Sequence, residues 1–139
     1  MQVSDELARL FANLGRALNR KAVPELAPAD AAVLFTLAAR PDGVRLSDLA
    51  HLKGLDVSTM SRRVSQLIDR DLVTRSPDPE DGRAVVITLT PEGYQQLTRE
   101  RARRVQLVTQ TLEDWGPEDK DRLASMLCRL NDSLEAAHE

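Results

Sequence analysis

The sequence predicts a mainly helical α+β domain, and three observations lead to that fold class. Aromatic residues make up only 3% of the chain, which favours aliphatic helix packing over an aromatic-rich sheet. Most stretches place apolar residues at steps of three and four, as amphipathic helices do. One central stretch changes to β-branched residues on either side of a polar turn, which is typical of a two-stranded hairpin.

The composition is that of an ordinary globular domain. Of 139 residues, 42% are hydrophobic and 29% are charged, which argues against wholesale disorder. No apolar run approaches the ~20 residues of a membrane span, and the amino terminus lacks a signal-peptide pattern. We therefore expect a cytoplasmic location and no membrane partner. Cys128 is the only cysteine, and a buried thiol in a helix is its expected environment.

The net charge of −3 does not by itself indicate a nucleic-acid partner. Its distribution is uneven, however. Residues 113–139 hold eight acidic and three basic side chains, a local charge of −5, so the remaining residues sum to +2. An acidic protein with this distribution can still present a positive face to a polyanion.

Two helices are predicted at the start of the chain. Apolar residues at helical spacing predict an amphipathic helix from about Ser4 to Ala22, which Pro24 then ends. Pro28 suits the first position of a second helix that runs to about Arg40. Because this second helix is apolar almost all round, we expect it at the centre of the core.

A closely spaced pair of helices follows. After a short strand, Val44 to Leu46, we expect Ser47 to cap a helix from Asp48 to Lys53. Gly54 can end that helix in the left-handed conformation, and Asp56 caps the next helix after only a few residues. Two helices joined this tightly, with glycine between them, predict a helix-turn-helix.

The second helix of the pair, about residues 58–69, has two different faces. Its apolar face is expected to pack on the domain and comprises Met60, Val64, Leu67 and Ile68. Short hydroxyls, an amide and one arginine dominate the other face, where a solvated helix more often carries lysine and glutamate. This face can approach base edges and phosphates, although a plain solvated face remains an equal alternative. Its residues are Ser58, Thr59, Arg62, Ser65, Gln66 and Asp69.

A hairpin is predicted next. Leu72 to Arg75 and Ala84 to Leu89 are rich in β-branched residues, and the polar segment SPDPEDG separates them. Arg83 is placed to project from the tip, and Asp81 could orient its guanidinium by a charge-assisted hydrogen bond. An ordinary soluble hairpin with a local ion pair is the competing interpretation of this Asp-x-Arg sequence.

Two long amphipathic helices complete the chain. Thr90 and Pro91 open a helix that continues to about Asp114, and Gly116-Pro117 separates it from a final helix, Glu118 to Ala137. A small domain offers little room for the apolar stripes of this helix and of the first helix. A two-fold homodimer would bury both, and its two recognition helices would face a pseudo-palindromic DNA site.

The run DVSTMSRRVSQLIDRDLVTRSPDPEDGRAVVITLTPEGYQQL resembles the core of the multiple antibiotic resistance regulator (MarR) family of winged-helix transcription factors. The resemblance implies one domain over residues 1–139, with a winged helix-turn-helix lobe at 28–90 and dimerisation helices at 1–22 and 91–139. It implies that helix 58–69 enters the major groove and that Arg83, supported by Asp81, enters the minor groove. The candidate DNA-binding residues are Ser58, Thr59, Ser61, Arg62, Ser65, Gln66, Arg75, Asp81 and Arg83.

The resemblance also implies repression that a small phenolic or lipophilic effector relieves. Candidate ligand-binding residues are Phe11, Arg16, Phe35 and His51, each of which also fits a structural role. Relatives that sense oxidants use a cysteine near the amino terminus, and here Cys128 lies in the last helix instead.

The leading hypothesis is therefore a homodimeric, sequence-specific regulator that binds double-stranded DNA. The sequence shows no glycine-rich phosphate loop and no metal-ligand spacing, so we expect no enzyme, no cofactor and no metal site. A winged-helix module that binds proteins instead of DNA is the alternative, and the acidic total charge supports it.

Overall fold

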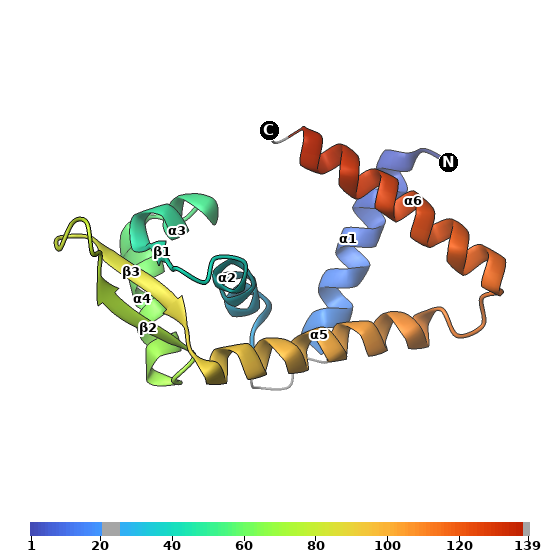
Figure 1. The fold of residues 1–139 in the computed structure, drawn as a ribbon. Helices are drawn as coiled ribbons and strands as arrows, with labels where there is room; N and C mark the ends of the chain where they lie inside the picture. Colours follow the sequence, from blue (N-terminus) through green and yellow to red (C-terminus); the bar gives the residue numbers. More distant parts are fainter. Residues whose placement is uncertain (21–25, 138–139) are drawn as a thin grey trace. The chain divides into compact units, whose positions relative to one another are not determined.

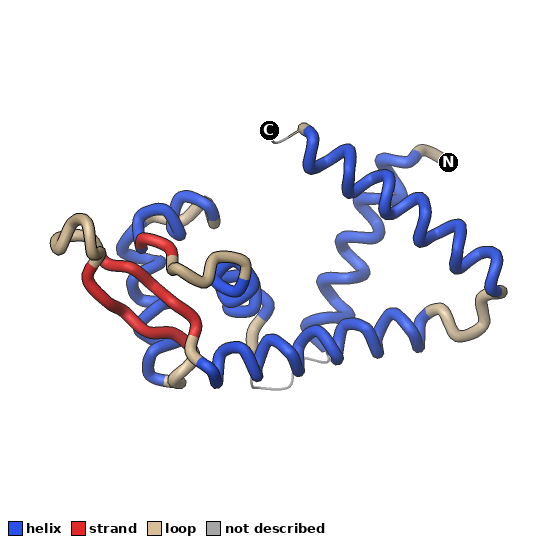
Figure 2. The backbone as a smooth tube through the Cα atoms, viewed as in Figure 1, coloured by secondary structure: helices blue, strands red, loops and turns tan. Residues whose placement is uncertain are grey.

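The computed structural model describes residues 1–20 and 26–137 (Figures 1 and 2). The chain divides into two compact units, residues 1–102 and residues 103–139. Within the described ranges, no helix combines the length and the apolar character that a membrane crossing requires.

Helices dominate both units, and three short strands lie in the first (Figure 2). The elements of the first unit, in chain order, are α1 (Val3–Arg20), α2 (Pro28–Ala38), β1 (Val44–Arg45), α3 (Leu46–Leu52), α4 (Val57–Asp69), β2 (Val73–Pro77) and β3 (Val85–Leu89). Helix α5 (Pro91–Thr111) begins in the first unit and ends in the second, and α6 (Pro117–Ala136) belongs to the second. The predicted mainly α, α+β fold class is confirmed.

The strands form a small antiparallel sheet in the order β1-β3-β2. Strand β3 is central: Ile87 pairs with Val44 of β1 on one side and with Arg75 of β2 on the other. Figure 1 shows β2 and β3 as a hairpin with an extended tip. The predicted hairpin is therefore present, with β2 extending two residues further, to Pro77.

The core of the first unit is built around α2. Four residues of this helix are buried, among them Leu34 and Leu37 at 0% and 1% exposure, and Pro28 stands at the helix start as predicted. The helix ends at Ala38, two residues before the predicted Arg40. The other buried apolar residues are Leu26, Val44, Leu49, Ala50, Met60, Val64, Leu67, Leu72, Val73, Ile87 and Leu97.

The start of α3 differs from the prediction. We expected Ser47 to cap the helix, but Leu46 already belongs to it and Arg45 occupies the N-cap position without a side-chain cap. The expectation was wrong because the chain passes directly from extended backbone at Arg45 (φ −61°, ψ 141°) into the helix. The predicted helix end is confirmed, since Gly54 has a φ of +64°, where a side chain would be strained.

The junction between the hairpin and α5 is held by two residues. Thr90 Oγ accepts a hydrogen bond from the Gly93 N–H at 2.9 Å and donates to the Asp71 carbonyl at 2.6 Å. A Cβ at position 93 would lie 2.2 Å from the Leu72 carbonyl oxygen, so only glycine permits this close approach. The predicted threonine cap is confirmed, and it fixes where α5 leaves the sheet.

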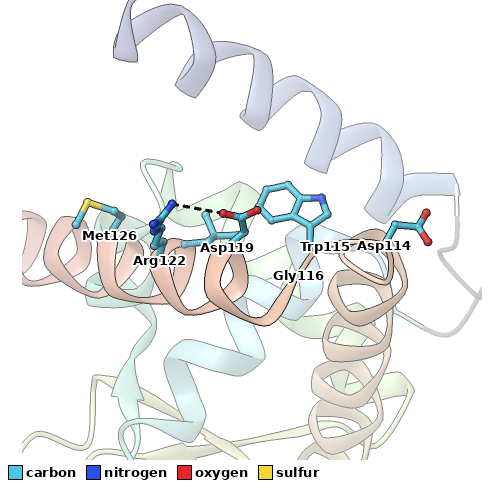
Figure 3. Close-up of a pocket in the computed structure, with 7 residues that line it drawn as sticks. Asp114, Trp115, Gly116, Asp119, Arg122 and Met126 are labelled. Carbon is cyan, nitrogen blue, oxygen red and sulfur yellow. Dashed lines mark ion pairs between the residues drawn. The ribbon is translucent and has the colours of Figure 1, made fainter.

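The second unit has a different character. Helix α6 contains no buried residue, and its Gly116-Pro117 start is as predicted. Cys128 is exposed, so the expectation of a buried thiol was wrong. The reason is that, among the residues that the structure describes, no other element of this unit buries a face of α6. A pocket at the start of α6 is lined by Trp115, Leu123, Met126 and several charged residues (Figure 3). Arg122 and Asp119 form an ion pair there at 3.7 Å.

Two sequence predictions fall outside the described residues. These are the end of the first helix at Ala22 and its termination by Pro24. The predicted division into a DNA-binding lobe and dimerisation helices stays a prediction.

Candidate nucleic-acid interface

The start of α4 is capped by Asp56, as predicted. One carboxylate oxygen accepts hydrogen bonds from the Thr59 N–H at 2.6 Å and from the Ser58 hydroxyl at 2.8 Å. These bonds, the Thr59 N–H foremost, lower the pKa of Asp56 to about 2 because they favour the charged carboxylate. The Ser58 hydroxyl has one proton and donates it to Asp56, so this group can only accept a hydrogen bond from another molecule.

The two faces of α4 lie as the sequence predicts. Met60, Val64 and Leu67 are buried in the core, and Ile68 is half-buried against it. On the opposite face Ser58, Arg62, Ser65 and Gln66 are exposed, whereas Thr59 and Ser61 are half-buried. The arrangement leaves one side of the helix free to approach another surface.

Ser65 links α4 to the hairpin. Its hydroxyl donates to the Ser61 carbonyl at 2.9 Å and accepts a hydrogen bond from Arg75 of β2 at 3.4 Å. The structure thus brings Arg75 beside the exposed face of α4. Within the described residues, Arg62 and Gln66 are the long polar side chains of this face that make no hydrogen bond to the protein. The polar groups of these two side chains are therefore available to a binding partner.

Val57 is absent from the predicted set, although it belongs to the same face. It is the first residue of α4, 51% exposed, and shares helical spacing with Ser61 and Ser65. Apolar side chains at this place can contact a thymine methyl group. The available signal was its position directly after the Asp56 cap.

The tip of the hairpin is closed by main-chain hydrogen bonds. The Asp78 N–H donates to the Ala84 carbonyl, and the Ala84 N–H donates to the Asp81 carbonyl, both at 2.9 Å. The Asp81 carboxylate accepts from the backbone N–H of Arg83 at 3.1 Å. The predicted bond to the Arg83 guanidinium is not formed among the described residues. Asp81 thus supports the exposed Arg83 through its backbone.

An ion pair that the sequence did not predict lies at the base of this tip. Arg45 Nε donates to Asp78 Oδ2 at 2.6 Å, and the Asp78 side chain is only 10% exposed. The other Asp78 oxygen accepts from the Glu80 N–H at 2.9 Å. The hydrogen bond from the Glu80 N–H and the nearby Arg45 guanidinium both lower the pKa of Asp78. The hydrogen bond between Arg45 and Asp78 in turn raises the pKa of Arg45. The partners are 33 residues apart, so no local pattern reveals them.

The four candidate ligand-binding residues lie on three helices. Phe11 and Arg16 are exposed on α1, where Arg16 donates a hydrogen bond to the Asn13 side chain. His51 is exposed on α3. Phe35 of α2 is half-buried, with the Arg101 guanidinium 5.3 Å from its ring centroid, a cation–π geometry. A binding role for the four stays a prediction. In the described ranges, no group of three or more histidine, cysteine or carboxylate side chains could hold a metal ion.

A tight helix pair whose second helix exposes a polar face, followed by a hairpin with an arginine near its tip, defines a winged helix-turn-helix protein. The sequence pattern of the MarR family matches residues 26–85. This region, which holds the helix-turn-helix and most of the hairpin, is similar to the MarR family.

Similar proteins include a curated relative and two solved structures. The chain is 34% identical to the uncharacterized HTH-type transcriptional regulator YxaD of Bacillus subtilis over 87 residues, 63% of this chain and 61% of YxaD. It spans about three fifths of the length of the curated relatives it matches. The transcriptional regulator PcaV of Streptomyces coelicolor, solved with its natural ligand, is 26% identical, with a TM-score of 0.65 over 96% of this chain and 94% of PcaV. The transcriptional repressor CouR, solved on a 23-mer DNA duplex, is 25% identical, with a TM-score of 0.71 over 94% of this chain and 92% of CouR.

Proposed function

We propose that this chain is a sequence-specific, DNA-binding transcriptional regulator that acts as a homodimer. One observation carries the proposal: exposed arginines lie on α4, which packs on the core, and on the hairpin tip, which main-chain hydrogen bonds close. Groups that bind DNA must be exposed and yet preorganised, because each mobile side chain costs free energy when it is immobilised. The solved complex of CouR with DNA supports this proposal.

In the proposed complex α4 lies in the major groove. Arg62 and Gln66 have the chemistry for base edges, since arginine pairs with guanine and glutamine with adenine through two hydrogen bonds each. Val57 would meet a thymine methyl group. The hydroxyls of Ser58 and Ser65 already donate hydrogen bonds within the protein, so these residues would position neighbouring side chains. Arg75 would contact a phosphate.

The hairpin would place Arg83 in the adjacent minor groove. An exposed guanidinium on a narrow tip suits that groove, where negative potential is enhanced in A·T-rich DNA. Arg83 is exposed and its backbone is held by Asp81. This contact adds affinity and a preference for groove shape.

The homodimer would form through the terminal helices. Their exposed large apolar residues include Leu10, Phe11, Leu14, Val105, Val108, Met126, Leu127, Leu130 and Leu134. Burying this surface against a second copy provides a two-fold axis. Two recognition helices would then read half-sites about 10 base pairs apart, or a multiple of that, in a pseudo-palindromic operator.

We include effector control in the proposal. A small phenolic or lipophilic molecule would release a repressor from its operator by favouring a conformation that binds DNA less well. Two similar proteins support effector control: PcaV was solved with its natural ligand, and CouR is a transcriptional repressor. Phe11, Arg16, Phe35 and His51 remain the residues to test by substitution.

The test is an anisotropy titration with two duplexes, one carrying the region upstream of the protein's own gene and one a scrambled copy. We expect tight binding to the first, weakening as salt rises because counterions are released. Arg83→Ala should fold and dimerise normally but lose at least about tenfold in affinity, or ~1.4 kcal/mol. Arg9→Ala, which removes an exposed arginine from α1, is the matched control and should bind nearly as wild type.

Two results would contradict the proposal. Equal binding of Arg83→Ala and wild type would remove the hairpin from the DNA interface. Absence of salt-dependent binding to either duplex would favour the alternative, a winged-helix module that binds proteins.

A further inference from the structure

We infer that the Arg45–Asp78 ion pair is a positioning device for Arg83, and that it sets DNA affinity without touching DNA. The inference rests on the proposed DNA-binding function. It starts from the fact that a half-exposed arginine of β1 and a nearly buried aspartate of the hairpin tip meet at 2.6 Å.

The tip is a single hydrogen-bonded loop, and Asp78 joins it to the rest of the domain. Its N–H holds the Ala84 carbonyl, next to Arg83, and its Oδ1 holds the Glu80 N–H. The remaining oxygen, Oδ2, binds Arg45. Displacement of Asp78 would therefore displace the segment that carries Arg83.

Arg45 is itself fixed by the fold. Its backbone pairs with Val86 in the sheet, and it occupies the N-cap position of α3, the first helix of the helix-turn-helix. The ion pair thus connects the tip directly to the element that precedes the recognition helix. Without it, the tip would be attached only through the β2–β3 ladder, in which Pro77 pairs with Val85 at the outer end.

A fixed tip matters because the minor groove is narrow, ~6 Å wide in B-DNA. An arginine on a mobile loop must lose the loop's conformational freedom as well as its own when it enters the groove. A tip already held in position avoids the first loss. The predicted effect of the ion pair therefore appears in DNA affinity more than in the stability of the fold.

The direction in which one substitution changes DNA affinity distinguishes a positioning role of Asp78 from a purely electrostatic one. Asp78→Asn removes a negative charge near a polyanion, which by itself should strengthen DNA binding. If the carboxylate positions Arg83, the same substitution should weaken binding. Asparagine keeps an oxygen for the Glu80 N–H, so the local turn can still form while the charged contact with Arg45 is lost.

The experiment measures operator affinity for four full-length proteins: wild type, Asp78→Asn, Arg83→Ala and the double variant. Glu80→Gln is the control, because Glu80 is exposed two residues away and loses the same charge. The DNA is the upstream duplex used above, and thermal melting checks that each variant is folded. We expect Asp78→Asn to bind at least about fivefold more weakly, and Glu80→Gln to bind equally or more tightly.

The double variant is the decisive comparison. If Asp78 acts through Arg83, adding Asp78→Asn to Arg83→Ala should produce no further loss. If Asp78→Asn binds DNA as tightly as Glu80→Gln does, the inference is overturned. The proposed function would still be supported in that case, provided that wild type binds the operator. A full, additive loss in the Arg83→Ala background would also overturn the inference. Wild type that bound no DNA would instead defeat the proposed function, and the inference with it.

Discussion

The first unit and α6 follow the same kind of sequence pattern and reach opposite outcomes. Leu34, Met60 and Leu67 are at most 1% exposed, whereas Leu127, Leu130 and Leu134 of α6 are 37–51% exposed. Met60 and Leu67 recur at helical spacing along α4, as the three leucines do along α6. An amphipathic pattern therefore predicts that a face will be covered, but it does not say whether the cover comes from the same chain.

The difference has an energetic consequence. Full burial of a leucine side chain contributes about 1.5–3 kcal/mol relative to exposure. The first unit gains this from its own elements, since α2, α4 and the sheet supply each other's cover. Helix α6 gains little of it within the second unit, so we expect its stability to depend on a second copy and hence on protein concentration.

A matched pair of leucine truncations gives the largest expected contrast. Leu34→Ala leaves a cavity in a closed core and should lower the free energy of unfolding by about 2–5 kcal/mol. Leu134→Ala, at a 51% exposed site, should cost less than about 1 kcal/mol when the protein is dilute and monomeric. Chemical denaturation of both variants across a hundredfold range of concentration measures this. Equal losses at high dilution would contradict the comparison.

The second prediction concerns the partner of α6. Leu130→Glu places a charge in the centre of the exposed stripe, and burying that charge in a dimer is unfavourable. We expect at least about tenfold weaker dimerisation, measured by analytical ultracentrifugation. Leu52→Glu is the control, because Leu52 is also an exposed leucine, at 48%, but lies in α3. A wild-type chain that is monomeric at every concentration would refute the homodimer.

Much of the fold follows from local sequence. Pro28, Asp56, Thr90 and Gly116-Pro117 mark helix starts that the structure confirms, because caps and prolines act through hydrogen bonds within one helical turn. Ser47 is an exception. A good capping residue stands there, yet the adjoining strand extends the chain up to Arg45 and the helix begins one residue before Ser47.

The candidate site was predictable in outline and not in its internal bonds. Helical periodicity placed Arg62, Ser65 and Gln66 on the exposed face of α4. No periodicity shows that Ser65 is bonded to Arg75 of β2, or that Asp78 is bonded to Arg45 across 33 residues. Such pairs depend on the sheet register, which tertiary packing determines.

The helix starts of the two regions offer the finest comparison and the smallest predicted effect. Helix α4 is capped by the Asp56 carboxylate, whereas the N-cap residue of α6 is Gly116, which provides no side-chain cap. Because folding lowers the pKa of Asp56 from 3.8 to about 2, its charged form stabilises the folded state. That contribution is complete above pH 3.8 and is lost as the pH falls towards 2.

Asp56→Asn should isolate this contribution, since asparagine is also a good cap but carries no charge. We expect wild type to melt at a higher temperature than Asp56→Asn near neutral pH, with the gap narrowing between pH 4 and pH 2.5, roughly the interval between the two pKa values. Asp56→Ala, which lacks the accepting oxygen, should melt lowest of the three near neutral pH. Melting curves followed by circular dichroism give all three comparisons. A gap between wild type and Asp56→Asn that stays constant down to pH 2.5 would show that the charge of Asp56 does not stabilise α4.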